Sequence, residues 1–445
     1  MNNLLRKIPK IDTFIKHDDF RGFNKKLLVR AARKEIDILR QGIIDSKISN
    51  FDINKLTTNT KIRYKNILSS SLKPMINATG VILHTNMGRS LISKQILERA
   101  SAIICNYSNL EYDSDKGKRG ERYTHAKKGL KELLNVEDVL VVNNNASAVF
   151  LILNSFAKKQ KVIVSRGELV EIGGSFRVPE VMKESGALLK EVGTTNKTKL
   201  SDYENAIDDN TKMLMKVHKS NFSIEGFSEE VSFEAIKKIA VKNNLMDYYD
   251  LGSGYVVDLP YNLGDKEHSL LNILKHKPSL ISFSGDKLFG SVQAGIIAGK
   301  KEFIDKLKKN QLLRMLRVDK ITLSILEETV KAYLLQDYEQ IPTLKLLFQS
   351  IDSLEKRVLK IQSSLEKGVC DIVKSTTFMG GGTLPNKKFP TITLHIIGDA
   401  VKLEKIFRLN NLIGRIERDK FLIDFRSILP SLDTNIEQII KKVLD

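Results

Sequence analysis

Between about residues 77 and 300, short apolar runs alternate with segments whose apolar positions recur at helical spacing. Seven of these runs are five to seven residues long, which is typical of buried strands, and a helix is expected from about Ala146. Strands that alternate with helices predict βαβ units around a largely parallel sheet. We expect the strands at Asp138–Val142, Lys161–Ser165, Ala187–Val192, Thr211–Val217, Leu245–Asp250, Leu280–Ser284 and Ala294–Ala298.

The pattern changes after about residue 320. Apolar positions at helical spacing predict two long amphipathic helices, at Leu323–Leu334 and Thr343–Leu365. Three glycines, Gly380 to Gly382, then break the pattern, and the alternation of elements beyond them indicates a smaller α+β domain. Its strands are expected at Thr391–Ile397, Gly414–Glu417 and Phe421–Phe425, and its helices at Asp399–Leu409 and from Asp433.

The first 70 residues have the pattern of a separate helical unit, with apolar residues at helical spacing between Leu27 and Leu39. The polar stretch from Ser69 to Pro74 is typical of a linker. We therefore divide the chain into a helical domain (residues 1–65), a linker (66–88), a large α/β domain (89–335) and a small α+β domain (336–445).

The net charge of the chain indicates the kind of partner that it binds. The 445 residues include 72 Lys and Arg against 53 Asp and Glu, a net charge of +19, which suggests a polyanion such as nucleic acid. Residues 1–70 alone carry 16 basic and 7 acidic residues. Arg30, Arg33, Lys34 and Arg40 surround the apolar positions of the expected helix. They are candidate contacts to nucleic acid, although such charges taken by themselves are more often a solvated helix surface.

Several classes of protein are excluded. The two cysteines, Cys105 and Cys370, lie 265 positions apart without a CxxC motif, which excludes a disulfide framework and a cysteine zinc site and fits a reducing cytoplasm. The N-terminus has no apolar signal segment, and no run approaches 18 apolar residues, so we expect a soluble cytoplasmic protein. P-loop, HExxH and GxSxG motifs are absent and the seven histidines are scattered, so we expect no metal.

Two predicted strand ends carry groups with a shared chemistry. Asp250 ends one strand before a Gly-rich loop, and Lys287 follows Ser284 at the end of the next, 37 positions later. That separation leaves room for one βα excursion between neighbouring strands. An amine and a carboxylate at adjacent strand ends are what a pyridoxal phosphate (PLP) enzyme requires: the lysine binds the cofactor aldehyde, and the carboxylate keeps the pyridine nitrogen protonated. A solvated surface lysine is the alternative.

The same chemistry requires anion sites. Asn144, Asn145 and Ala146 lie between a strand and a helix, where free N–H groups could hold the cofactor phosphate, and ordinary N-capping by asparagine explains them equally well. Arginine forks match phosphate geometry, but each arginine alone is explained by a surface position or a salt bridge. The arginines in distinctive local settings are Arg89, Arg122, Arg314 and Arg317.

Motifs along essentially the whole chain, in order, resemble those of the bacterial selenocysteine synthase family. The segments that carry the resemblance are INATGVILHTNMGR (76–89), YSNLEYDSDKGKRGER (107–122), VVNNNASAV (141–149), VSRGELVEIGGSFR (164–177), VGTTNKT (192–198), YDLGSG (249–254), SFSGDKLFG (282–290), LRVDK (316–320) and MGGGTLP (379–385).

The resemblance implies a fold-type I PLP enzyme that converts L-seryl-tRNA(Sec) to L-selenocysteinyl-tRNA(Sec) with selenophosphate, through loss of water to an aminoacrylyl-tRNA and addition of selenium. Lys287 matches the lysine that binds the cofactor, and Asp286 matches an acidic residue of the site. The four arginines match residues implicated in selenophosphate handling. The basic N-terminal domain is expected to hold the tRNA, and the assembly is expected to be a ring of dimers, a homodecamer.

Two alternatives remain open at this point. The chain could be a PLP-dependent lyase or transferase that acts on a free small amino acid or amino sugar acid. It could also be a non-enzymatic tRNA-binding protein with a degenerate PLP fold, although the presence of both Asp250 and Lys287 argues against that.

Overall fold

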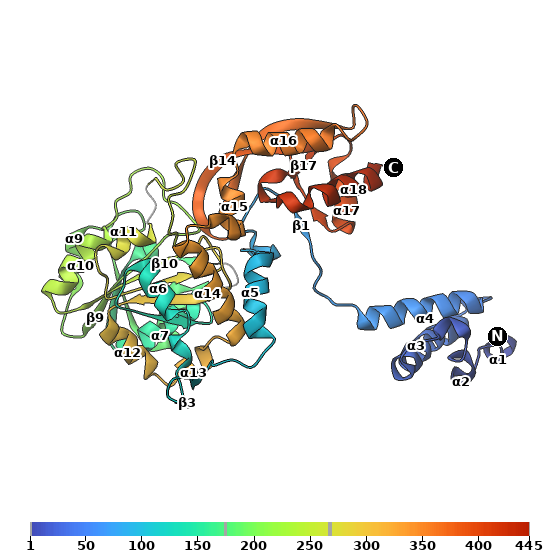
Figure 1. The fold of residues 1–445 in the computed structure, drawn as a ribbon, viewed down its shortest axis with the longest axis horizontal. Coiled ribbons are helices and arrows are strands. Elements are labelled where there is room, and N and C mark those ends of the chain that lie inside the picture. Colours follow the sequence, from blue (N-terminus) through green and yellow to red (C-terminus); the bar gives the residue numbers. More distant parts are fainter. Residues whose placement is uncertain (1, 173–175, 266–268, 445) are drawn as a thin grey trace. The chain divides into compact units, whose positions relative to one another are not determined.

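The computed structural model describes residues 2–172, 176–265 and 269–444, and the chain divides into two compact units, Met1–Pro74 and Met75–Asp445 (Figure 1). The first unit is helical, as predicted. Its helices are α1 (Asn2–Arg6), α2 (Ile11–Phe14), α3 (Lys25–Ile44) and α4 (Ile53–Leu68), with a 3-10 turn at Asp18–Phe20. The apolar positions of α3 include Leu28, Ala32 and Ile36, which are buried in one small core with Phe14 and Leu56.

The predicted linker over residues 66–88 is too long. Helix α4 continues to Leu68, and the chain enters the second unit at Met75. The short strand β1 (Ile76–Asn77) pairs in parallel with β15 (Leu412–Ile413), and Ile82 and Leu83 are buried. These apolar residues have places in the core of the second unit, so only the polar stretch up to Pro74 connects the two.

The second unit contains a seven-stranded sheet in the order β4-β12-β11-β10-β9-β5-β8. Only β12 runs antiparallel to its neighbours, which confirms the predicted α/β class and largely parallel sheet. The strands match the seven predicted runs to within two residues at either end. They are β4 (Asp138–Val142), β5 (Lys161–Ser165), β8 (Leu188–Val192), β9 (Thr211–Val217), β10 (Met246–Gly252), β11 (Leu280–Ser284) and β12 (Gly295–Gly299).

Helices cover both faces of this sheet because its strands are apolar at successive positions. Val139 and Val141 of β4 pack on one side in a core that includes residues of α6 and α14. Leu140 and Val142 pack on the other side with residues of α7, α8 and α12. The helices of this region are α5 (Lys94–Ile104), α6 (Lys127–Leu134), α7 (Asn145–Phe156), α8 (Val178–Ser185), α9 (Leu200–Ala206), α10 (Phe233–Lys242), α11 (Leu270–Leu274), α12 (Lys301–Lys308), α13 (Leu313–Leu316) and α14 (Lys320–Leu334).

The C-terminal region has a four-stranded antiparallel sheet in the order β13-β14-β17-β16, as the α+β pattern indicated. The single helix predicted at Thr343–Leu365 is wrong, because Ser350 caps a second helix: its side chain accepts from Ser353 N at 3.2 Å. The glycines 380–382 form a hairpin turn. The elements are α15 (Pro342–Phe348), α16 (Ile351–Gln362), β13 (Cys370–Gly380), β14 (Thr383–Ile396), α17 (Ala400–Leu409), β16 (Arg415–Glu417), β17 (Lys420–Asp424) and α18 (Asp433–Leu444).

Two short antiparallel ribbons lie outside these sheets. Two-stranded ribbons join β2 (Tyr112–Asp113) to β3 (Lys118–Arg119) and β6 (Glu171–Ile172) to β7 (Phe176–Arg177). Residues 173–175, part of one motif of the family resemblance, lie outside the described residues. Among the helices that the structure describes, none is both long and apolar enough to cross a membrane.

Candidate functional site

The two predicted strand-end residues lie in one cavity. Asp250 is in β10 and Lys287 follows β11, and the two strands pair in parallel with Asp250 beside Ser282. Their side chains line a cavity of about 250 Å³, which we call the strand-end cavity. Every residue predicted to bind the cofactor lines it, together with two other predicted site residues. The lining from those predictions is Asn144, Asn145, Ala146, Asp250, Ser284 and Lys287, with Arg89 and Asp286.

Burial governs the electrostatics of this cavity. Both Asp250 and Lys287 are only 5% exposed. Burial raises the pKa of Asp250 above its ordinary value, opposed by the hydrogen bond that Asn145 Nδ2 donates to its Oδ1 at 2.7 Å and by the charge of Lys287. Burial likewise lowers the pKa of Lys287, and the nearby charge of Arg89 lowers it further. The charges of Asp250 and Asp286 oppose these two effects, and the net result is that Lys287 gives up its proton more readily than an ordinary lysine.

The start of helix α7 closes one end of the cavity. Asn144 acts as an ordinary N-cap, since its side chain accepts from Ser147 N at 2.8 Å. Asn145 differs, because its amide oxygen is buried and has no hydrogen-bond partner among the described residues. An orphaned polar atom beside free helix N–H groups is suited to a polar ligand. The amine, the carboxylate and this helix start together fit the aldehyde, ring nitrogen and phosphate of PLP.

Asp286, predicted as a catalytic residue, is held in an ion pair. Its Oδ2 accepts from Arg89 Nη1 at 2.8 Å. Arg89 has a left-handed backbone (φ 60°), and its N–H donates to His84 O at 3.1 Å. This contact joins the segment before α5 to the turn that carries Lys287.

The four predicted arginines do not converge within one chain. Arg122, Arg314 and Arg317 line a second cavity of about 350 Å³, the arginine cavity, whereas Arg89 lines the strand-end cavity. Glu111 lies among them: Arg122 Nε and Nη2 donate to its Oε1 at 3.0 and 2.9 Å, and Arg317 Nη1 lies 3.5 Å away. The hydrogen bonds from Arg122 hold the pKa of Glu111 below its ordinary value.

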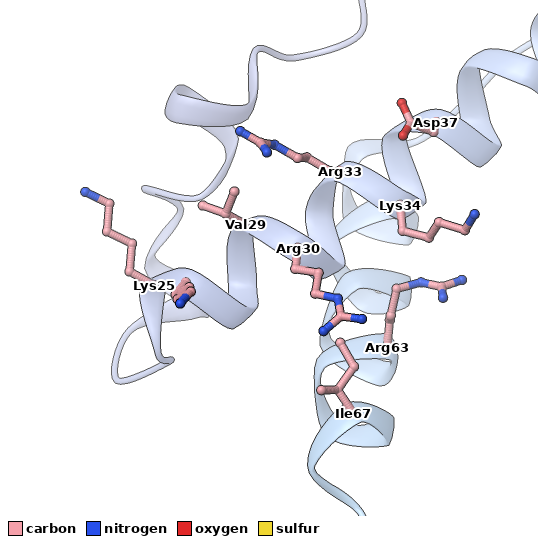
Figure 2. A pocket seen from close by; sticks show the side chains of 9 residues that line it. Lys25, Val29, Arg30, Arg33, Lys34, Asp37, Arg63 and Ile67 are labelled. Atoms are coloured by element: carbon pink, nitrogen blue, oxygen red, sulfur yellow. The ribbon is translucent and has the colours of Figure 1, made fainter.

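Three of the four predicted nucleic-acid contacts share a groove in the N-terminal unit. Arg30, Arg33 and Lys34 of α3 line a cavity of about 1020 Å³, the basic groove, whose lining also includes Val29. Figure 2 shows Arg30 extending from α3 towards Arg63 and Ile67 of α4. Arg40 is not among the lining residues; its Nη1 donates to Asp37 Oδ1 at 3.1 Å.

Sequence reasoning missed several residues of these cavities. The strand-end cavity is also lined by His218, directly after β9, and by Gln293, and the arginine cavity contains Glu111. A signal existed for His218, because it follows a predicted strand at the edge where Asp250 lies, and its N–H donates to Asp250 O at 2.9 Å. Nothing in the local sequence marked Gln293. The remaining unpredicted lining residues of the strand-end cavity are Val170, Val217, Ser220 and Gly252.

Comparisons with known proteins give one consistent family description. The family model described as L-seryl-tRNA selenium transferase matches residues 75–429. Two similar proteins, from Aliarcobacter butzleri and Sulfurimonas denitrificans, are named L-seryl-tRNA(Sec) selenium transferase. They are 59% and 56% identical, over 100% and 99% of this chain and 99% of each relative. The solved structure of D-glucosaminate-6-phosphate ammonia-lyase matches 85% of this chain and 97% of its own with a TM-score of 0.60 at 16% identity, a likeness of fold.

Proposed function

Because the chain belongs to the L-seryl-tRNA selenium transferase family, we propose that it converts L-seryl-tRNA(Sec) to L-selenocysteinyl-tRNA(Sec) with selenophosphate as selenium donor. The observation that carries the proposal is the strand-end cavity, in which Lys287 and Asp250 face the same space. This arrangement suits the fold-type I architecture and the PLP cofactor of the family. The two distant cysteines support the proposal that the enzyme works in the cytoplasm.

Lys287 is the residue that we expect to bind the cofactor and to move the proton of the serine α-carbon. Its lowered pKa favours the neutral amine, the only form that attacks a carbonyl or accepts a proton. Burial makes the ionised form of Asp250 costly, and a protonated ring nitrogen beside it would stabilise that form. When bound, PLP withdraws the electrons released at the α-carbon. The serine hydroxyl would then leave as water with the proton that Lys287 took up. The selenium of selenophosphate would bond to the β-carbon, and hydrolysis of its bond to phosphorus would release phosphate.

The arginine cavity supports selenophosphate binding. Within the described ranges, the side chain of Arg314 makes no hydrogen bond or ion pair, so its guanidinium group is available to an anion. Arg122 and Arg317 are already oriented by Glu111. Since Arg89 lies in the other cavity, we propose that a partner subunit brings its arginine cavity to the strand-end cavity. Such a complete site fits the expected homo-oligomer, a ring of dimers forming a decamer.

The basic groove supports the binding of tRNA. Phosphate contacts supply most of the non-specific affinity for nucleic acid, and A-form RNA presents its backbone and shape rather than its base edges. Arg30 and Arg33 lie one turn apart on α3, so both can meet the same backbone. The groove and the two cavities lie in different units of the chain. This suits a tRNA substrate, because its reacting serine lies at one end of a long molecule.

The first experiment supplies the full-length, PLP-loaded enzyme with selenophosphate and either seryl-tRNA(Sec), free L-serine or an amino sugar acid. We expect selenocysteinyl-tRNA from the first substrate alone. Turnover of a free amino acid or amino sugar acid without turnover of seryl-tRNA would contradict the proposal and favour a small-molecule lyase or transferase. Binding of tRNA without any turnover would instead favour a non-enzymatic protein.

The groove is tested by charge reversal on one helix. Arg30→Glu changes a groove residue, and Arg40→Glu makes the same change outside the groove. We expect Arg30→Glu to weaken binding of seryl-tRNA(Sec) and to reduce the slope of log K against log salt by about 1 for each phosphate that the protein no longer neutralises. Arg40→Glu should change both quantities less. Equal effects of the two variants would show that general charge, and not the groove, attracts the tRNA.

A further inference from the structure

The large sheet divides along its carboxyl edge, between β5 and β9. Strand β9 follows β10 as far as Val217, which lies beside Asp250, and β5 follows β8 as far as Ser165. Between these two pairs of strands, β5 pairs with β9 only up to Ile163, beside Leu214. The last residues of β5 and of β9 therefore continue separately, and we call these two ends the β5 side and the β9 side.

The side chain of Glu168 connects the two sides. Glu168 ends the 3-10 turn that follows β5, and its Oε2 accepts from Val217 N at 2.9 Å, beyond the last paired residues of β5 and β9. Its Oε1 accepts from Lys216 Nζ at 2.8 Å, and Lys216 Nζ also donates to Val231 O at 2.9 Å. One carboxylate of the β5 side therefore holds both a backbone amide and a side chain of β9.

Both members of this ion pair are almost completely buried, with side chains that are 3% exposed for Glu168 and 2% exposed for Lys216. Taking two charges out of water can cost as much free energy as their attraction returns, so apolar residues of similar size often give equal stability. Charge-assisted hydrogen bonds, however, fix the relative position of the groups that they join. The position that the pair imposes therefore explains it better than stability does.

Residues from both sides line the strand-end cavity. Val170, two residues after Glu168, belongs to the β5 side, whereas Val217 and His218 belong to the β9 side. His218 N donates to Asp250 O at 2.9 Å, which joins the β9 side to the strand that carries the buried carboxylate. Since a close-packed interior transmits small displacements, a change in the distance between the two sides would move Val170 relative to Asp250.

We propose that Glu168, paired with Lys216, is a positioning residue, which joins the β5 side to the β9 side and so sets the spacing of the cavity walls on which cofactor binding depends. The inference rests on the proposed function for the identity of that cofactor, PLP. It goes beyond the lining of the cavity, since neither side chain is among the described residues that line it.

The experiment removes both charges and varies the acceptor for the Val217 amide. The double variant Glu168→Gln/Lys216→Met keeps a side-chain oxygen that can accept from Val217 N, and Glu168→Leu/Lys216→Met does not. Glu230, whose Oε2 lies 3.9 Å from Lys216 Nζ, keeps Lys219 as a partner in both variants. Titration of each cofactor-free protein with PLP measures a dissociation constant, and the absorbance spectrum of the bound cofactor is a second readout.

We expect the glutamine variant to bind PLP as the wild type does. The leucine variant should bind it roughly tenfold more weakly, which is the usual cost of one lost hydrogen bond, and the spectrum of the bound cofactor should change. A role in stability alone predicts no such difference between the variants. Equal PLP affinities of the two variants, or weaker binding by the glutamine variant, would overturn the inference.

A matched control separates position from stability. Asp138→Asn removes a buried carboxylate from the first residue of β4, at the opposite edge of the sheet, where it pairs with Lys127 and Lys308. This variant should unfold at a lower temperature without a change in PLP affinity. An equal loss of PLP affinity in the control would overturn the inference, because it would show that lost stability alone weakens binding.

A measurement on the wild type covers the case in which the leucine variant does not fold. In the cofactor-free protein, the Val217 amide should exchange its hydrogen as slowly as the paired amides of β10, because Glu168 holds it. Rapid exchange of that amide would overturn the inference. An enzyme that binds PLP as expected but does not turn over seryl-tRNA would instead contradict the proposed function, which is a distinguishable result.

Discussion

The strand-end cavity and the arginine cavity each place a carboxylate next to cations, yet the two carboxylates are shifted in opposite directions. Asp250 is almost completely buried, and burial raises its pKa. The side chain of Glu111 is 34% exposed, and the hydrogen bonds of Arg122 lower its pKa. Desolvation outweighs the neighbouring charge of Lys287 in the first case, and ion pairing outweighs desolvation in the second.

The two carboxylates therefore suit ligands of opposite charge. A buried carboxylate that is costly to ionise favours a cationic ligand, as a protonated ring nitrogen would be. A partly exposed carboxylate among arginines neutralises them and keeps them in place, and an incoming anion competes with it for their hydrogen bonds. We therefore expect covalent chemistry in the strand-end cavity and reversible anion binding in the arginine cavity. Single substitutions in each cavity test this difference between the strand-end cavity and the arginine cavity.

Lys287→Ala should have the largest effect. Without the amine, the strand-end cavity loses the group that binds the cofactor aldehyde, so we expect loss of covalently held PLP and of all measurable turnover. In the wild type, borohydride reduction and peptide mapping should place the label on Lys287. The exposed Lys301, changed to Ala, is the control and should leave labelling and turnover unchanged. Label on another lysine would contradict the assignment.

Arg122→Ala should affect the anion and not the cofactor. Losing one charge-assisted hydrogen bond costs about 1.5–3 kcal/mol, so KM for selenophosphate should rise roughly 10- to 100-fold. The spectrum of bound PLP should stay that of the wild type. Arg408→Ala, which removes an exposed arginine paired with Glu404, is the matched control. A changed spectrum of bound PLP together with an unchanged KM for selenophosphate would contradict this assignment, because it would show that Arg122 acts on the cofactor and not on the anion.

The sequence predicted the strand-end cavity better than the arginine cavity for a physical reason. Asp250 and Lys287 end apolar strands whose pattern is local, and adjacent parallel strands bring their ends together. Glu111 and Arg314 meet through an irregular segment and a four-residue helix, which have no such periodicity. For the same reason, no local pattern showed that the turn at Gly382 would lie near Lys287, since its position depends on how two sheets pack.

The fold was predicted with the same limits. Continuous apolar runs identified the strands of the large sheet. Strand β13 was missed because only three of its residues are fully buried and the polar run Lys374 to Thr377 interrupts its apolar positions. The long helix predicted from Thr343 is interrupted at Ser350, where a capping hydrogen bond outweighs continued apolar periodicity. Local patterns therefore identified most elements, and tertiary packing decided their breaks and contacts.

Asp250→Asn should have opposite effects on the cofactor-free and the PLP-loaded enzyme. The raised pKa means that the folded state binds the Asp250 proton more tightly, so its contribution to stability is fully present below about pH 3.8 and is lost as pH rises through the folded pKa. Asparagine avoids that loss and keeps an oxygen for Asn145. The cofactor-free variant should be more stable than the wild type at pH 7, by about 1 kcal/mol, with a smaller difference at pH 4. Thermal unfolding measures this.

With PLP bound, the same variant should lose turnover by 100-fold or more on an order-of-magnitude estimate, because a neutral ring nitrogen is a poor electron sink. Asp247→Asn is a useful comparison, since Asp247 is equally buried in β10 but receives hydrogen bonds from Ser279 and does not line the cavity. It should lower stability without the selective effect on turnover. A cofactor-free Asp250→Asn protein that is less stable than the wild type at pH 7 would contradict the burial argument.

Glu111→Gln should have the smallest effect and the opposite dependence on pH. The lowered pKa of Glu111 means that its contribution to stability is present above about pH 4.5 and is lost as pH falls through the folded pKa. Because the pair is partly exposed, solvent screening limits the loss in the variant to about 0.2–1 kcal/mol at pH 7, falling towards zero at pH 3 and in high salt.

The same change removes the internal competitor for Arg122 and Arg317, so inorganic phosphate should bind the variant at least as tightly as the wild type. Denaturant unfolding across this pH range and phosphate titration measure the two effects. Weaker phosphate binding would instead show that Glu111 serves mainly to hold the arginines in their binding positions.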